Sequence, residues 1–307
     1  MFGKQCRVKF STAVHRTKGT VDYIHSDLWG PAPVVSKGGA SYLLTFIDDF
    51  SRKVWIYFLK KKSEVFITFK QWKALIERQT SKKIKRLRTD NGMEFCSKEF
   101  DEFCKNECIV RHRTAAGTPQ QNGIAERMNR TLLERARSML SQAGLSKTFW
   151  AEAANTACYL VNRSPSTAIE LKTPEEVWSG SPSDYSHLRI FGCLAYAHVT
   201  GDKLEPRAKK CIFVGYAQTQ GVKAYRLWCP DPQSPKFMIK RDVTFDESAM
   251  LQMREKSTTE NGDQVSSKQG ELEVKLSMKN AVQEETVPDV TVDVPESSTT
   301  RRQSPQR

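Results

Sequence analysis

The sequence predicts a mixed α/β domain, followed by a small all-β module and a polar tail. Between residues 21 and 162, strand-like and helix-like patterns alternate, beginning with three strands. From Leu188 the pattern changes to short strands separated by Gly, Pro and Asp, and after Met250 large apolar residues become rare. Alternating strands and helices favour an α/β sheet, whereas evenly spaced short strands favour a small barrel.

Apolar alternation predicts the first half of the α/β domain. Asp48-Asp49 and Ser51-Arg52 supply turn residues between the second and third strands. Ser63 is expected to be the N-cap of the first helix, in which apolar residues recur at helical spacing to about Gln79. The strands that we expect here are Val21–Leu28, Tyr42–Ile47, Val54–Leu59 and Ile84–Thr89.

The second half of the domain is predicted in the same way. A long helix from about Asn122 to Gln142 ends before Gly144, a residue type that commonly closes helices. The other expected elements are a helix at Ser97–Asn106, a strand at Ile109–Thr114, a loop at Ala115–Gln121 and a helix at Lys147–Asn162. This order resembles the ribonuclease-H-like fold, a mixed five-stranded sheet with helices, in which a hairpin meander is joined to parallel strands. The first strand is then central, beside the strand that ends at Asp90.

The rest of the chain is expected to hold a barrel-like module and a disordered tail. The module's four strands are predicted at Ile190–Val199, Lys210–Tyr216, Ala224–Trp228 and Phe237–Phe245. Residues 251–307 are rich in Ser, Thr, Glu, Gln and Lys, a composition typical of disordered segments.

Charge and composition limit the possible partners. The 307 residues carry a net charge of +13, and because residues 251–307 contribute −2, the first 250 carry +15. A basic ordered region predicts nucleic acid as the partner, the alternative being a merely soluble basic surface. No stretch approaches 18 uninterrupted apolar residues and no secretory signal is visible, so neither a membrane nor secretion is expected. The eight scattered cysteines are expected to be reduced and mostly buried.

Three carboxylates stand where strands end or a helix begins: Asp27, Asp90 and Glu126, with thirty-five residues between the last two. Asn91-Gly92 predicts a tight turn that leaves Asp90 at a strand tip, and Asn122-Gly123 predicts a helix start that places Glu126 in a first turn. Three acids on separate elements can hold two divalent cations, and hard oxygen ligands suit Mg²⁺ and Mn²⁺. Four acids in the same neighbourhoods compete for this role: Asp22, Asp48, Asp49 and Glu94.

Local sequence around these acids shows a family resemblance. The segments are Ile24-His25-Ser26-Asp27-Leu28-Trp29-Gly30-Pro31, Thr89-Asp90-Asn91-Gly92-Met93-Glu94-Phe95 and Pro119-Gln120-Gln121-Asn122-Gly123-Ile124-Ala125-Glu126-Arg127. They resemble the D,D-35-E integrase core of retroelements, and in detail the integrase region of copia-type retrotransposon Pol polyproteins. Phe191-Gly192-Cys193, Lys210–Tyr216 and Arg241–Phe245 are similar to the region that follows that core. The resemblance extends from about Gly3 to Asp246.

The resemblance implies a metal-dependent polynucleotidyl transferase that processes element DNA ends and joins their 3′-hydroxyls to target DNA. Asp27 would bridge two Mg²⁺ or Mn²⁺ ions, while Asp90 and Glu126 would each hold one. Double-stranded DNA, both element ends and target, is the implied partner, together with further copies of the chain in a homo-oligomer. Action on chromosomal DNA implies a nuclear location, preceded by a cytoplasmic particle.

Several residues are candidates for DNA contact. On the long helix, Arg130 lies one turn beyond Glu126 on nearly the same face, so Arg127 and Arg130 could grip the phosphates of a DNA end. An ordinary solvated face with Glu134 as a salt-bridge partner is the alternative. The other candidates are Asn122, Lys209 and Lys210.

The sequence departs from the family at its start. Copia-type integrases carry a His-His-Cys-Cys zinc module that ends just before a Gly-Lys pair. Gly3-Lys4 corresponds to that pair, and Met1 starts just past where the last cysteine of the module would stand. We therefore expect no structural zinc in this sequence. The expected division is a linker remnant at residues 1–15, a catalytic core with trailing helices at 16–182, the β module at 187–248 and the tail at 251–307.

Three functional hypotheses remain open at this point. The first is an active integrase. The second is a catalytically inactive DNA-binding remnant of a decayed retrotransposon, and the third is a ribonuclease-H-type nuclease. Metal-dependent joining of DNA, as opposed to binding or cutting alone, distinguishes the first from the other two.

Overall fold

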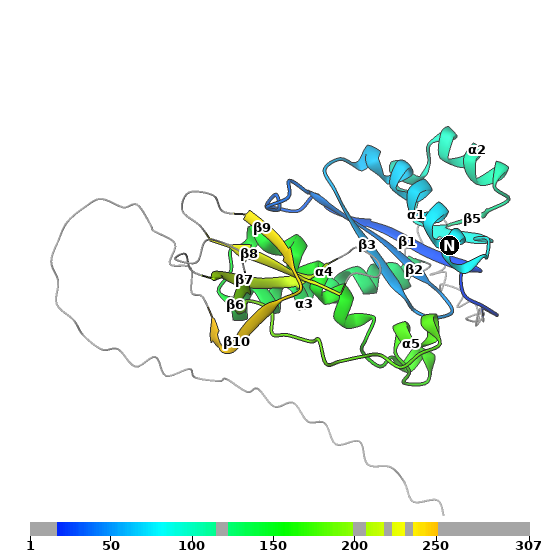
Figure 1. Cartoon of the computed structure of the whole chain (residues 1–307). Coiled ribbons are helices and arrows are strands. Elements are labelled where there is room, and N and C mark those ends of the chain that lie inside the picture. The colour runs from blue at the N-terminus through cyan, green and yellow to red at the C-terminus, as the bar shows by residue number, and fades with distance from the viewer. Residues whose placement is uncertain (1–16, 115–121, 199–206, 218–222, 231–235, 251–307) are drawn as a thin grey trace, which may run out of the picture. The chain divides into compact units, whose positions relative to one another are not determined.

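A computed structural model describes residues 17–114, 122–198, 207–217, 223–230 and 236–250. In these residues the chain forms two five-stranded sheets together with the helices that pack on them (Figure 1). Residues 1–15 and 251–307, and the expected loop at 115–121, lie outside the described residues. The predictions of a linker remnant, of a disordered tail and of the remaining domain boundaries therefore stay predictions.

The first sheet has the mixed topology that the sequence predicts. Its strand order is β3-β2-β1-β4-β5, so β1 is central and lies beside β4. The first three strands form an antiparallel meander, whereas β1, β4 and β5 run parallel. The strands are β1 (Tyr23–Trp29), β2 (Tyr42–Asp48), β3 (Val54–Leu59), β4 (Arg86–Thr89) and β5 (Val110–Arg113).

Helices cover both faces of this sheet because its strands alternate apolar side chains between the two faces. Leu44 and Phe46 pack against α1 (Val65–Thr80) and α2 (Lys98–Asn106) on one face. Leu43 and Ile47 pack against α3 (Gly123–Ala143) and α4 (Trp150–Val161) on the other. Shorter elements complete this part: η1 (Lys62–Glu64), η2 (Met93–Phe95), η4 (Lys147–Phe149), η5 (Thr167–Ile169) and α5 (Pro174–Ser179).

The second sheet is entirely antiparallel, with strand order β10-β6-β7-β8-β9. Ile212, Val214 and Trp228 of this sheet share a buried core with Phe149 and Trp150 at the start of α4. The strands are β6 (Cys193–His198), β7 (Ala208–Tyr216), β8 (Tyr225–Cys229), β9 (Lys236–Lys240) and β10 (Val243–Met250).

Two predicted elements are wrong in detail. The expected strand Phe237–Phe245 is two strands, because the chain bends at Arg241-Asp242 and β10 crosses to pair with β6 at the opposite edge. Ser63 does not cap the first helix: it lies inside η1, and Glu64 occupies the N-cap of α1. By contrast, Ser97 does cap α2, accepting a hydrogen bond from the Phe100 amide at 3.2 Å.

The expectation of reduced cysteines is also wrong at one pair. Cys211 and Cys229 form a disulfide, with 4.2 Å between their α-carbons. They stand opposite one another on β7 and β8, next to the paired residues Ile212 and Trp228. Strand register, which the spacing of cysteines in the sequence does not reveal, brings the two sulfur atoms together. None of the described helices is long and apolar enough to span a membrane.

Candidate acidic active site

Parallel pairing of β1 and β4 places Asp27 beside Asp90. His25 lies opposite Arg88 in this pair, and both acids follow two residues later in their strand directions. Because side chains alternate along a strand, residues two positions further on keep the same face and remain neighbours. Asp90 follows the last residue of β4, where its carboxylate accepts a hydrogen bond from the Gly92 amide at 3.1 Å. The predicted turn at Asn91-Gly92 therefore holds Asp90 at the strand tip.

The start of α3 presents three polar residues to the same place. Asn122, Glu126 and Asn129 lie four and three residues apart, so they share one face of the helix. The Asn129 amide donates to Asp27 Oδ2 at 2.8 Å, and the Asn122 amide approaches Asp27 Oδ1 at 3.4 Å. Glu126 lies between them in the first turn of α3, as predicted, and is exposed.

The other two acids act electrostatically on Asp27. Burial, then the negative charge of Asp90, raise the pKa of Asp27 to about 6, and the charge of Glu126 adds to this shift. The hydrogen bond from Asn129 opposes it by stabilising the carboxylate. An acid that is crowded by two others and only partly compensated by amides is a site that favours a cation.

Asn129 is a site residue that the sequence analysis missed. It is buried, and its side-chain oxygen accepts a hydrogen bond from the Thr45 hydroxyl of β2. Thr45 stands opposite Asp27 in the β1–β2 pair. The Asn129 side-chain amide therefore links Thr45 of β2 to the Asp27 carboxylate of β1. A polar residue three positions after Glu126, on the buried face of a predicted helix, was the available signal.

The four competing acids have structural partners. Asp48 is fully buried and accepts hydrogen bonds from the Val21 amide at 2.7 Å and from the Ser51 amide and hydroxyl at 2.8 and 2.6 Å. Asp49 contacts His25 at 3.0 Å and Arg52 at 3.3 Å. Asp22 and Glu94 pair with Lys85 and Lys62, at 2.6 and 3.6 Å. Asp48 and Asp49 are thus held by buried or half-buried partners, whereas Asp22 and Glu94 pair with exposed lysines.

The three acids offer hard oxygen ligands suited to Mg²⁺ or Mn²⁺. In the described part of the chain, however, no three His, Cys, Asp or Glu side chains are gathered closely enough to hold an ion. The donor set and the raised pKa of Asp27 fit a metal site, while the assignment of ligands stays a prediction.

The candidate DNA contacts fall into two groups. Arg127, Arg130 and Lys210 are exposed, and Lys209 is half-buried. Asn122 is instead completely buried, and its amide also reaches the Ser26 carbonyl at 3.3 Å. That placement suits a residue that positions Asp27 and does not favour direct contact with DNA. All five assignments stay predictions.

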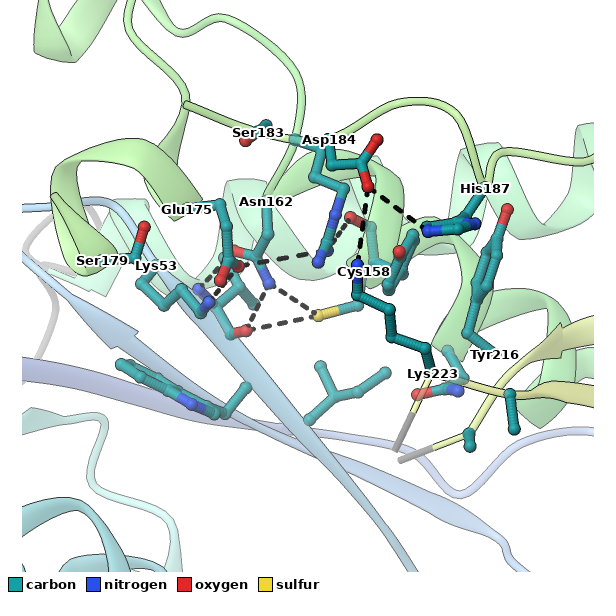
Figure 2. Close-up of a pocket in the computed structure, with 18 of the residues that line it drawn as sticks. Lys53, Cys158, Asn162, Glu175, Ser179, Ser183, Asp184, His187, Tyr216 and Lys223 are labelled. Carbon is teal, nitrogen blue, oxygen red and sulfur yellow. Dashed lines mark hydrogen bonds and ion pairs between the residues drawn. The ribbon is translucent and has the colours of Figure 1, made fainter. Parts of the chain in front are cut away.

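A large cavity of about 1180 Å³ lies away from the acids, between β3, α4 and the second sheet (Figure 2). None of Asp27, Asp90 and Glu126 lines it. Asp27 and Asp90 instead stand towards the carboxyl ends of β1 and β4, and Glu126 stands on the first turn of α3.

Comparison with protein families matches two parts of the chain. Residues 20–119 match the integrase core domain, and residues 193–259 match the retroviral polymerase SH3-like domain. The chain is 50% identical over 251 residues to the retrovirus-related Pol polyprotein from transposon TNT 1-94 of Nicotiana tabacum. The matched region covers 81% of this chain. It belongs to the integrase region of copia-type retrotransposon Pol polyproteins.

This chain spans about a fifth of that polyprotein, since the match covers 19% of the polyprotein's length. It is also 34% identical over 251 residues to the Pol polyprotein from transposon RE1 of Arabidopsis thaliana, covering 81% of this chain and 17% of the relative. Asp27 and Asp90 fall inside the integrase core match, whereas Glu126 lies beyond its end at residue 119. The assignment of Glu126 thus depends on its spacing and on the geometry of α3.

Comparison with solved structures also returns matches. One is the catalytic core domain of HTLV-2 integrase in complex with magnesium, in a dimeric form, which is 23% identical with a TM-score of 0.40. The match covers 53% of this chain and 99% of that one. The strand order of the first sheet itself, with β1 between β2 and β4, confirms the predicted ribonuclease-H-like integrase core.

Proposed function

We propose that this integrase region catalyses two reactions, trimming of element DNA ends and joining of their 3′-hydroxyls to target DNA. Membership of a polynucleotidyl transferase family supports the reaction class. The observation that carries the proposal is the position of Asp27 on β1, where the charges of Asp90 and Glu126 both act on it. Three acids from separate elements, β1, the end of β4 and the first turn of α3, suit phosphodiester chemistry.

The residues of this chain would share the work as follows. Asp27, Asp90 and Glu126 would hold two Mg²⁺ or Mn²⁺ ions, which activate the attacking oxygen and stabilise the departing one. Asn129 and Asn122 fix the orientation of the Asp27 carboxylate. Arg127 and Arg130, exposed beside Glu126, would contact DNA phosphates.

The assembly that acts is proposed to be a homo-oligomer on double-stranded DNA. Each DNA end needs one acid site, and two ends must be joined to one target, so at least two copies are required in the same complex. A nuclear site of action, on chromosomal DNA, is part of the same proposal.

A strand-transfer assay tests the proposal. Purified full chain, labelled duplex ends, plasmid target and Mn²⁺ are compared for wild type, Glu126→Gln and Glu134→Gln. Glu134 is exposed on the same helix, so its variant controls for the loss of a surface charge. We expect joined product from wild type and Glu134→Gln, and none from Glu126→Gln.

Other results would overturn the proposal in distinguishable ways. Salt-sensitive DNA binding by all three proteins, without any nicked or joined product, would identify an inactive DNA-binding remnant. Cleavage of the RNA strand of a hybrid duplex, without joining, would identify a ribonuclease-H-type nuclease.

A further inference from the structure

The cavity along β3 is a feature that the proposed integrase chemistry does not use. Five consecutive residues of this strand, from Val54 to Phe58, line one side. The end of α4 and residues of the segment from Ser179 to His187 form a second wall, and Tyr216, Ala217 and residues 223–225 form a third. Figure 2 shows Lys53, Asn162 and Glu175 at one end of the groove, and Tyr216 and Lys223 at the other.

Strand β3 is the outermost strand of the first sheet, so one of its edges has no neighbouring strand. The Lys53 carbonyl accepts a hydrogen bond from the Asp48 amide, and the Leu59 carbonyl accepts one from the Ser41 amide. The backbone N–H and C=O groups of odd-numbered residues in β3 therefore point towards β2. Because hydrogen-bonding direction alternates along a strand, the backbones of Val54, Ile56 and Phe58 face the groove.

Only the first of these three has its backbone groups paired. Asn162 at the end of α4 accepts from the Val54 amide and donates to its carbonyl, both at 2.8 Å. Within the described residues, no hydrogen bond reaches the amide or carbonyl of Ile56 or Phe58 on the groove side. Unpaired backbone groups at a sheet edge can form hydrogen bonds with another strand. The Asn162 side chain pairs with Val54 in the way that the backbone of such a strand would.

Charge defines what kind of strand would fit. Four cationic side chains line the groove against two acidic ones, which leaves a charge of +2 when His187 is neutral. Glu175 pairs with Lys53, and Asp184 with Lys223 at 3.7 Å. Arg241 is exposed and has no ion pair within the described part of the chain. The lining cations are Lys53, Arg163, Lys223 and Arg241.

We propose that this groove binds an extended, acidic peptide segment of a partner protein, added to β3 as a sixth strand. Hydrogen bonds to Ile56 and Phe58 would align the segment, and Lys223 and Arg241 would attract its acidic side chains. The groove is bounded on both sides of β3, by the end of α4 with residues 179–187 and by the second sheet, so the segment would lie between these walls. The cavity slightly exceeds the range that suits a drug-sized molecule, as expected for a peptide.

Fluorescence anisotropy with a labelled hexapeptide tests the proposal. The peptide alternates valine with aspartate or glutamate. Two further versions carry backbone N-methyl groups, one version on its odd-numbered residues and the other on its even-numbered residues. Strand addition uses the amides of one parity only, so we expect one N-methylated version to bind about tenfold more weakly and the other to bind like the parent. If the two N-methylated versions bind equally more weakly than the parent peptide, or if both bind as tightly as the parent, strand addition is overturned.

Charge variants test the second part of the proposal. Lys223→Glu and Arg241→Glu should each weaken binding of the acidic peptide, whereas Lys105→Glu, an exposed position on α2, should not. A lysine-containing version of the peptide that binds equally well would refute charge complementarity. Displacement of the acidic peptide by a single-stranded oligonucleotide, with the same loss in Lys223→Glu, would show instead that the groove binds nucleic acid.

Discussion

At the scale of residues, the site is built around a carboxylate that the fold does not favour in its charged form. The pKa of Asp27 is raised to about 6 by burial and by Asp90 and Glu126. The unfolded chain holds the same group near 3.8, so the native state is penalised wherever Asp27 is ionised. That penalty is absent below pH 3.8 and complete above about pH 6.

Removing this charge should therefore stabilise the metal-free protein. We expect Asp27→Asn to raise the free energy of unfolding by about 1–3 kcal/mol at pH 7 in EDTA, as measured by urea denaturation. The advantage should disappear below pH 3.8, where wild-type Asp27 is protonated. The same variant should be inactive in strand transfer. A variant that is less stable than wild type at pH 7 would contradict the electrostatic account.

Asn129 provides a second residue-scale prediction. Asn129→Ala removes the hydrogen bond to Asp27 Oδ2, so the Asp27 pKa should rise further and protons should compete more strongly with metal. We expect the Mg²⁺ concentration for half-maximal joining to increase about tenfold at pH 6.5 and less at pH 8. Ser138→Ala, exposed on the same helix, is the control. A loss of activity that is independent of both Mg²⁺ and pH would indicate a structural role only.

At the scale of elements, α3 links the candidate acidic site to the core of the first sheet. Its first turn carries Glu126 and its buried side packs on the first sheet. At its far end the Gly144 amide donates to carbonyls of the last turn, with Gly144 at φ +61°. That left-handed conformation is the one that glycine tolerates and other residues resist.

The helix end gives a test that needs no activity. Gly144→Ala should lower the free energy of unfolding by about 1 kcal/mol, because the conformation is strained for alanine even though a β-carbon would meet nothing within 4 Å. Gly38→Ala is the matched control, since Gly38 has no positive φ and only Ser36 Oγ, at 3.8 Å, nearby. Equal urea midpoints for the two variants would contradict the argument.

At the scale of the whole described molecule, the two sheets share a core. The Trp228 ring lies 5.5 Å from that of Phe149 and 4.8 Å from that of Phe237. Glu152 of α4 pairs with Arg226 of β8 at 3.4 Å, and the Thr156 hydroxyl contacts the Val214 carbonyl at 3.3 Å. Apolar burial that is continuous between two units makes them unfold together.

Cooperative unfolding is the corresponding prediction. Trp228→Ala should cost about 3–5 kcal/mol and should shift a single transition, seen alike by circular dichroism and by tryptophan fluorescence. Ile239→Ala, half-exposed in the same sheet, should have little effect. Two separate transitions, with only one displaced by Trp228→Ala, would show that the sheets fold independently.

Local patterns in the sequence were sufficient for most elements and for the candidate acids. Val54–Leu59 was predicted with its observed bounds, and the long helix was predicted to within one residue at each end. These elements have strong periodicity and end at residues with a physical reason to end them, such as Gly144. The Arg241-Asp242 bend gave no such signal, because it depends on β10 pairing with β6 across the module.

The sequence by itself determined the order of strands and helices and the basic charge, and it pointed to three candidate acids, because periodicity, composition and spacing are local properties of the chain. Only the tertiary structure decided what those residues meet. It placed Asn129 and Thr45 behind Asp27, joined Cys211 to Cys229, and left the backbone of β3 facing a cationic groove. Each of these depends on register and packing between segments far apart in the sequence, which no local pattern encodes.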